Sequence, residues 1–287
     1  MPLVFAAIAP HGFPLIPDLS DDADGAIVTR VAMEEFGRRA AAAEIESIVI
    51  AGPHGVRVDG AICLADTARA AGALAWQGRQ VELNVPVDGL LTDALVAKAK
   101  ERGMPIARAG YGGNRRDQSV LPLDWGILTP LWFLGHGRNM PGHGNVLADP
   151  PADDIGPPAV IVTPLRSLPR QTLVDFGRAV AEVSAVEPRR IGFIASCDWG
   201  HAHAAVGPYG FHDESARVDA EVVAAVQAND LMRLMDLDEG RVQDAAIDGL
   251  WQALMLAGAF EVTPMNVELL SYEAPTYYGM LVAVWAP

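Results

Sequence analysis

Hydrophobic residues run without interruption through several short segments, and the first two runs each lead into a Pro-His-Gly turn. LVFAAIA at residues 3–9 ends at Pro10-His11-Gly12, and SIVIA at residues 47–51 is followed by Pro53-His54-Gly55. Continuous apolar runs of this length are typical of strands with both faces buried, as in parallel sheets. The same pattern predicts further strands at residues 159–163, 190–196, 267–272 and 280–285.

Between these runs, apolar residues recur at the spacing of amphipathic helices. This spacing predicts helices over residues 24–43, 89–102, 170–185, 214–229 and 244–259. Residues 121–134 predict a helix-like or mixed apolar element entered through Asp124, and residues 60–87 predict strands and turns. Strands that alternate with helices indicate an α/β fold: a mostly parallel central sheet flanked by helices, with the active site at the strand ends. We expect one catalytic domain over residues 1–287.

The segment over residues 135–158 is rich in Gly, Pro, Asn and Asp. It is long for a connection inside a compact domain, so it is either a lid over the site or a disordered insertion. His136 and His143 lie in this segment, and its composition predicts that both are exposed to solvent.

Charge and cysteine content exclude several classes of protein. The chain has 21 basic and 36 acidic residues, a formal charge of −15, which argues against nucleic acid or an anionic membrane as partner. The only two cysteines, Cys63 and Cys197, are far apart, which argues against a disulfide scaffold or a structural zinc site. The N-terminal segment lacks signal-peptide features and no apolar run would span a bilayer, so we expect a cytoplasmic protein.

Three of the seven histidines follow a predicted strand: His11, His54 and His201. If the strands are parallel, the three turns meet at one edge of the sheet. Imidazole is the commonest metal donor in proteins. Two imidazoles and one carboxylate form the facial triad of iron(II) oxygenases, which leaves positions open for substrate and dioxygen. One such turn is weak evidence because these turns are common, but the three together favour a metal site.

Longer segments around these histidines extend the pattern into a family resemblance. VFAAIAPHGFPLIP, followed by IVIAGPHG, resembles the metal-binding opening of the class III extradiol ring-cleavage dioxygenases, a family that includes the catalytic subunit of protocatechuate 4,5-dioxygenase. LDWGILTPL and IASCDWGHAHAAVGPYGFHDESARVD resemble two later segments of that family, so the similarity runs from the first strand to at least Asp248. The resemblance implies an iron(II) enzyme that cleaves a small aromatic diol, or a 2-aminophenol, with dioxygen.

The resemblance also implies roles for single residues. His11 and His54 match the two histidine ligands, and His201 matches the base that acts on the substrate hydroxyl. The third ligand of the family is a carboxylate at the start of a late helix, which is Asp248 here, with Glu273 as the second candidate. An acid at a helix start is equally expected as an N-cap or first-turn residue, so both interpretations of Asp248 stay open.

The chain departs from the family at Trp125, where many relatives carry a histidine. An indole N–H does not titrate, so Trp125 is expected to contact the substrate and to donate no proton. His203 is a surface residue or, as the alternative, a catalytic substitute. Asp198 is placed to orient the ring of His201. Tyr277 is expected to bind a substrate oxygen, as is Tyr278 unless it belongs to the core.

Several alternatives remain open at this stage. Zinc in place of iron(II), held by the same ligands, would suit a hydrolase. A metal-binding or signalling protein without enzymatic activity is a further alternative, favoured if aromatic side chains fill the pocket. Arg115 and Arg116 either attract a substrate carboxylate or lie in a solvated turn. We expect a homo-oligomer.

Overall fold

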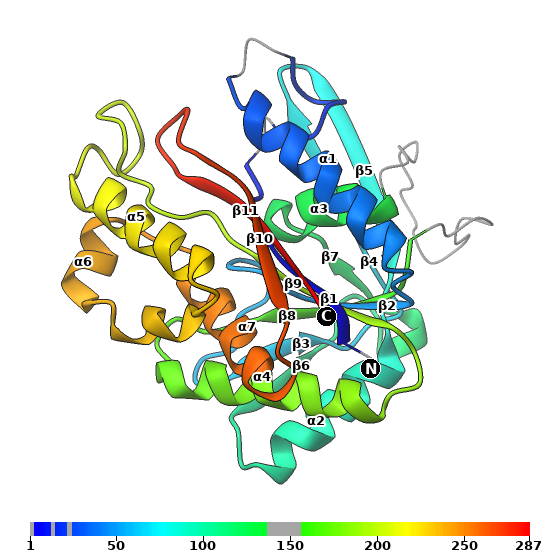
Figure 1. Cartoon of the computed structure of the whole chain (residues 1–287). Coiled ribbons are helices and arrows are strands. Elements are labelled where there is room, and N and C mark those ends of the chain that lie inside the picture. Colours follow the sequence, from blue (N-terminus) through cyan, green and yellow to red (C-terminus); the bar gives the residue numbers. More distant parts are fainter. Residues whose placement is uncertain (1–2, 13–14, 22–24, 137–155) are drawn as a thin grey trace.

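A computed structural model describes residues 3–12, 15–21, 25–136 and 156–287 of the chain (Figure 1). Its centre is an eight-stranded sheet with the strand order β10-β11-β1-β9-β2-β8-β3-β6. The strands of this sheet are β1 (Leu3–Ala9), β2 (Ser47–Ala51), β3 (Ile62–Ala65), β6 (Ile106–Ala109), β8 (Ala159–Thr163), β9 (Ile191–Ser196), β10 (Asn266–Glu273) and β11 (Met280–Ala286).

The four strands at the centre of the sheet, β1, β9, β2 and β8, are parallel to one another. Antiparallel pairing occurs toward the edges, between β10 and β11, β11 and β1, and β8 and β3. Ala9 pairs with Ser196 and Ala51 with Ala195, so β1, β9 and β2 end at the same edge. The predicted α/β fold with a mostly parallel central sheet is therefore confirmed.

Alternate residues of each central strand enter two hydrophobic cores on opposite faces of the sheet, as the period of two in a strand requires. Ile8 belongs to one core and Ala7 to the other. The Ile8 face is covered by α2 (Gly89–Glu101), α4 (Arg170–Val186), α5 (Glu214–Gln227), α6 (Glu239–Asp244) and α7 (Leu250–Val262) (Figure 1). The Ala7 face is covered by α1 (Ile27–Ala42), α3 (Trp125–Leu131) and a smaller sheet of β4 (Arg69–Trp76), β5 (Arg79–Pro86) and β7 (Val120–Pro122).

The helix predicted over residues 244–259 is wrong at its start. The chain leaves α6 at Asp244 and enters α7 only at Leu250. Ala246 has a positive φ of 50°, and its N–H donates to the Gln243 carbonyl while the Ile247 N–H donates to the Val242 carbonyl. This pair of hydrogen bonds around a left-handed residue ends a helix. Asp248 therefore lies in the connection between the two helices, outside either of them.

Most of the glycine-rich segment, residues 137–155 with His143, lies outside the described residues, so the lid and the insertion stay predictions. His136 is described, and the expectation that it is exposed is wrong. Its side chain is buried, and Nε2 lies 3.1 Å from the Pro157 carbonyl oxygen.

Both cysteines, Cys63 and Cys197, are buried and form no disulfide. In the part of the chain that the structure describes, no helix combines the length and the hydrophobicity that a membrane crossing needs.

Candidate metal centre and active site

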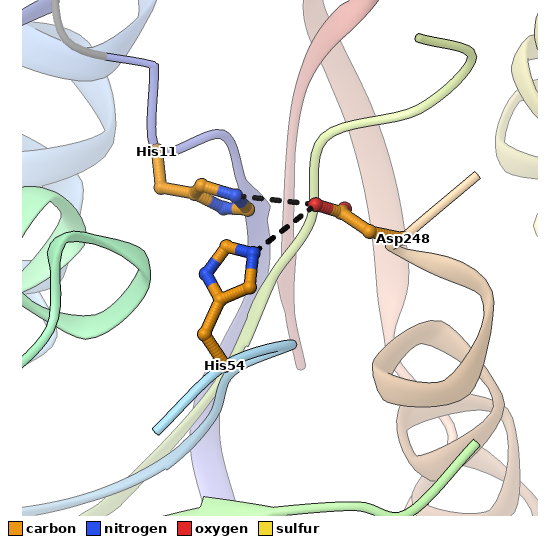
Figure 2. Close-up of side chains that lie close together, drawn as sticks. All are labelled: His11, His54 and Asp248. Atoms are coloured by element: carbon orange, nitrogen blue, oxygen red, sulfur yellow. Dashed lines mark ion pairs between the residues drawn. The ribbon is translucent and has the colours of Figure 1, made fainter. Parts of the chain in front are cut away.

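Three side chains that are far apart in the sequence converge at the carboxyl edge of the sheet (Figure 2). His11 follows β1, His54 follows β2, and Asp248 comes from the connection between α6 and α7. Asp248 Oδ2 lies 3.4 Å from His11 Nε2 and 3.8 Å from His54 Nε2. Donor atoms that bind one ion at about 2.0–2.2 Å lie roughly 3–4 Å apart, so this spacing suits a shared metal ion.

The hydrogen bonds of His11 orient its ring toward Asp248. Nδ1 lies 3.1 Å from Ser196 Oγ, and the Ser196 hydroxyl donates its one hydrogen to the Gly126 carbonyl. The Ser196 oxygen therefore accepts from His11 Nδ1–H, which leaves Nε2 to face the cluster. Burial alone would lower the pKa of His11, but Asp198 and Asp248 raise it to about 9. The position of Nε2 between two carboxylates thus favours a positive charge there, whether a proton or a metal ion.

Asp198 and Asp248 form a buried acidic pair linked through the backbone. Asp248 Oδ1 accepts from the Asp198 N–H at 3.1 Å, and Asp198 Oδ1 accepts from the His11 N–H at 3.1 Å. Burial opposes ionisation of both. For Asp248 the nearby imidazoles of His11, His201 and His54 outweigh burial and hold its pKa below the ordinary value. The pKa of Asp198 is raised, with burial as the main cause.

His201 presents its Nε2 nitrogen to the same cluster. Its Nδ1 lies 2.6 Å from the Trp199 carbonyl oxygen, which only accepts, so Nδ1 carries the hydrogen. Nε2 lies 3.7 Å from Asp248 Oδ2, and the ring stacks on Tyr278 with the centroids 5.7 Å apart. The expected orientation of His201 by Asp198 is wrong, because the Trp199 carbonyl holds the ring and Asp198 binds His11.

A cavity of about 650 Å³ opens beside the cluster, a size typical of small-molecule sites. His11, His54, Asp198, His201 and Asp248 line it, together with Trp125, Tyr277, Tyr278 and residues from the segments 166–167 and 239–251. Trp125 is 41% exposed, and its ring lies 4.4 Å from that of His54. Burial raises the pKa values of Tyr277 and Tyr278, so both hydroxyls keep their protons at neutral pH.

Glycine at position 12 allows Tyr278 to reach this site. A Cβ at Gly12 would lie 2.4 Å from the Tyr278 hydroxyl oxygen, closer than two such atoms approach. Any larger residue in the turn after β1 would displace the tyrosine that stacks on His201.

Two sequence candidates lie elsewhere. His203 Nε2 is 2.9 Å from Asp219 Oδ2, and His203 does not line the cavity. The Glu273 carboxylate accepts from both the backbone N–H and the hydroxyl of Thr29, each at 2.7 Å, so it holds the first turn of α1. Glu273 is not part of the cluster that gathers His11, His54 and Asp248.

The two arginines that the sequence offered for a substrate carboxylate, Arg115 and Arg116, pair with acidic residues instead. Arg115 pairs with Asp117, and Arg116 pairs with Asp66 and Asp93. Neither lines the cavity, which instead includes Arg166. The sequence analysis did not identify Arg166 and Ser196, although both lie at or just after the end of a strand, as the histidines do. Ser196 ends β9, and Arg166 follows β8 by three residues.

Comparisons with known proteins identify the family and a structure of similar fold. Residues 6–283 match the family model described as the catalytic LigB subunit of aromatic ring-opening dioxygenase. Protein CA_C1420 of Clostridium acetobutylicum is 21% identical over 268 residues, 93% of this chain and 54% of that protein, so the chain spans about half its length. The crystal structure of the uncharacterized protein JW3007 from Escherichia coli K12 has the same fold, with a TM-score of 0.63 at 14% identity over 98% of this chain and 99% of that one. The family match spans both cores and every residue of the cluster, and the chain therefore belongs to the family of catalytic LigB subunits of aromatic ring-opening dioxygenases.

Proposed function

We propose that this chain is a non-haem iron(II)-dependent extradiol dioxygenase that opens the ring of a catechol-type or 2-aminophenol-type compound with dioxygen. One observation carries the proposal: the His11, His54 and Asp248 cluster borders an open cavity, with Nε2 of His201 beside it. Membership of a family of ring-opening dioxygenases supports the choice of an aromatic substrate.

The donor set fits iron(II). Two imidazoles and one carboxylate on one side of an ion leave the other side free, and here that side is the cavity. His11 and Asp248 are both buried, so the site offers a cation two donors shielded from water. Bound there, iron(II) supplies the open coordination positions and the redox capacity that joining an aromatic diol to dioxygen requires.

His201 acts as the base in this proposal. The Trp199 carbonyl fixes the hydrogen on Nδ1, so a proton from a substrate hydroxyl goes to Nε2, which faces the cluster. The protonated ring then carries that proton beside the substrate and returns it during ring opening. This assignment gives one residue both roles, which matters because Trp125 does not titrate and His203 is bound to Asp219 outside the cavity.

Aromatic side chains hold the substrate in this proposal. Trp125 is partly exposed at the cavity and offers a flat face to an aromatic ring. Tyr277 lines the cavity and retains its hydroxyl proton, so it donates a hydrogen bond to a substrate oxygen. Asp198 contributes by holding the His11 backbone and by facing its ring.

The open cavity counts against a protein that only binds a metal, because such a protein is expected to fill this space with aromatic side chains. A zinc hydrolase would use the same ligands. The metal and the reaction therefore have to be measured together.

The test is oxygen uptake by protein loaded anaerobically with iron(II), against a panel of catechols and 2-aminophenols, with the visible absorbance of the ring-opened product followed in parallel. We expect uptake that His54→Ala abolishes. His212→Ala is the matched control, because His212 is exposed and lies outside the cavity, and it should keep full activity. Absence of uptake with every compound, despite stoichiometric iron, would refute the proposal, and ester hydrolysis by the zinc-loaded protein would then point to the hydrolase.

A further inference from the structure

Arg166 brings a positive charge to the wall of the cavity that contains the metal cluster. It follows β8, which pairs in parallel with β2, so Arg166 and His54 extend from neighbouring strand ends at the same edge of the sheet. Both residues line the cavity of about 650 Å³. The topology that gathers the histidines therefore also delivers this guanidinium.

Trp251 holds Arg166 in place by two contacts. The guanidinium carbon of Arg166 lies over the indole ring, 4.8 Å from its centroid, and the Trp251 Nε1–H donates to the Arg166 carbonyl at 3.0 Å. Trp251 is itself buried at the start of α7, three residues after Asp248. Stacking on an indole leaves the edge of a guanidinium free to donate hydrogen bonds. The side chain is thus supported from one side by a rigid element of the fold.

Arg166 is the one lysine or arginine among the described residues that line the cavity. The acids of the lining already have partners: Asp198 and Asp248 face the imidazoles, and Glu239 forms an ion pair with Arg170 at 2.7 Å. Within the described ranges of the chain, no carboxylate lies within ion-pair distance of Arg166. A cation on a cavity wall without an acidic partner is complementary to an anionic ligand.

We infer that Arg166 is a specificity-determining residue that selects aromatic substrates bearing a carboxylate. The planar guanidinium binds the two carboxylate oxygens in parallel, while the ring oxygens of the same molecule face His11, His54 and Asp248. The acidic chain, with its formal charge of −15, repels anions in general, and Arg166 offsets that repulsion at this wall. The inference rests on the proposed function for the orientation of the ring.

The test is equilibrium binding under anaerobic conditions, so that no turnover occurs. A dihydroxybenzoate is compared with the dihydroxybenzamide whose hydroxyls occupy the same positions, using iron(II)-loaded wild-type protein and calorimetry. The two ligands share the ring and the hydroxyls and differ at one substituent, an anionic carboxylate in one and a neutral carboxamide in the other. We expect the carboxylate to bind tighter by on the order of 10- to 100-fold, the value of a charge-assisted hydrogen-bonded pair. This preference should weaken as salt is added.

Three variants locate the source of that preference. Arg166→Gln removes the charge from an exposed side chain and should abolish the preference by weakening carboxylate binding alone, with amide binding changed less than about threefold. Arg166→Lys keeps the charge without the planar fork and should retain part of the preference. Arg115→Gln is the matched control, because it removes an arginine charge outside the cavity, and it should bind both ligands as the wild type does.

The outcomes separate this inference from the proposed function. Equal binding of the two ligands by wild-type protein, binding of neither, or a preference that survives Arg166→Gln would overturn the inference, even if neutral catechols were cleaved with oxygen uptake. A preference that depends on Arg166 supports carboxylate recognition, and the same protein failing to consume oxygen would count against the dioxygenase activity alone.

Discussion

His201 and His203 are two residues apart in one turn, yet their surroundings differ. The Trp199 carbonyl holds Nδ1 of His201, and Nε2 of that ring faces Asp248 in the cavity. His203 Nε2 instead contacts Asp219, a buried carboxylate that also accepts from the Tyr272 hydroxyl. Residues i and i+2 share a face in a strand, but an irregular turn does not preserve that relation. His201 therefore lines the cavity, whereas His203 is held by a buried carboxylate outside it.

Because of this difference, we expect substitution of His201 to lower kcat and substitution of His203 to lower stability. His201→Asn removes the proposed base, so kcat should fall by roughly 10²- to 10⁴-fold, with the iron content unchanged. His203→Asn should leave the pH dependence of kcat intact and lower the free energy of unfolding by about 1–3 kcal/mol, because buried Asp219 loses a partner. Steady-state kinetics, metal analysis and urea unfolding check both. A loss of kcat in His203→Asn comparable to that in His201→Asn would contradict this assignment.

Ser196 is expected to set the iron affinity through His11. Its oxygen accepts from Nδ1–H and so keeps Nε2 directed at the cluster. Ser196→Ala should weaken iron(II) binding by roughly 10- to 100-fold, as loss of a hydrogen-bond partner of a metal-binding histidine typically does. Competition with a chelator measures the affinity. Ser184→Ala, a buried serine in α4, is the control, and a similar loss of affinity there would assign the effect to folding.

For single residues, the sequence predicts which of them reach the site better than it predicts which side chains they contact there. His11, His54 and His201 are identified by the strand ends that they follow, a local feature of the chain. The partners of Asp198 and His203 depend on how separate segments pack, since Asp198 meets His11 across 187 residues and His203 meets Asp219, a residue of α5, across 16. No pattern in the sequence encodes such contacts. Arg166 could have been identified in the same way, because it follows the end of β8 as the histidines follow the ends of their strands.

Among the elements, the connection between α6 and α7 decides where the carboxylate of the cluster lies. The left-handed residue Ala246 ends α6, and the Ala245 carbonyl accepts from the His201 N–H at 2.7 Å. Gly249 then passes so close to Cys197 that a Cβ on it would lie 2.5 Å from the Cys197 Cβ. The connection is thus fixed at both ends to the turn after β9, with Asp248 between them.

We therefore expect metal binding to depend on the conformation of Ala246. Ala246→Val places a β-branched residue at positive φ, which should lower the free energy of unfolding by about 1–3 kcal/mol and weaken iron(II) binding by displacing Asp248. Ala246→Gly suits the left-handed conformation, so it should bind iron(II) as the wild type does. Urea unfolding and chelator competition give the two quantities. Wild-type iron affinity in a destabilised Ala246→Val protein would show that the connection tolerates another path.

The break between α6 and α7 could not be predicted from the hydrophobic pattern. α7 is buried on every side through its first ten residues, Leu250–Ala259. It therefore has no polar face, and the alternation of apolar and polar residues does not mark where the helix begins. The strands were easier, since β1, β2 and β8 are apolar runs bounded by polar turns and coincide with their predicted ranges. Helix ends set by backbone geometry, such as a left-handed alanine, have a weaker signal than those marked by glycine.

On the scale of the whole molecule, the cluster joins three segments that only the folded sheet brings together, at positions 11, 54 and 248. A metal ion bound there has no comparable site in the unfolded chain, so binding adds to the stability of the native state. With free iron(II) at one hundred times its dissociation constant, the gain is about 2.7 kcal/mol. For a protein of this size that gain should raise Tm by on the order of 5 °C, and a chelator should reverse it.

Asp248→Asn and Asp244→Asn distinguish this effect from a change in charge. Each removes one negative charge from a chain of net charge −15, but only Asp248 belongs to the cluster, whereas Asp244 lies at the exposed end of α6. In Asp248→Asn, Tm measured anaerobically should no longer respond to iron(II) or to the chelator, while Asp244→Asn should show the wild-type shift. Equal shifts in both variants would mean that iron(II) stabilises the fold by binding elsewhere. The difference between the two Tm responses therefore measures how much stability the folded protein gains from joining these three segments through one ion.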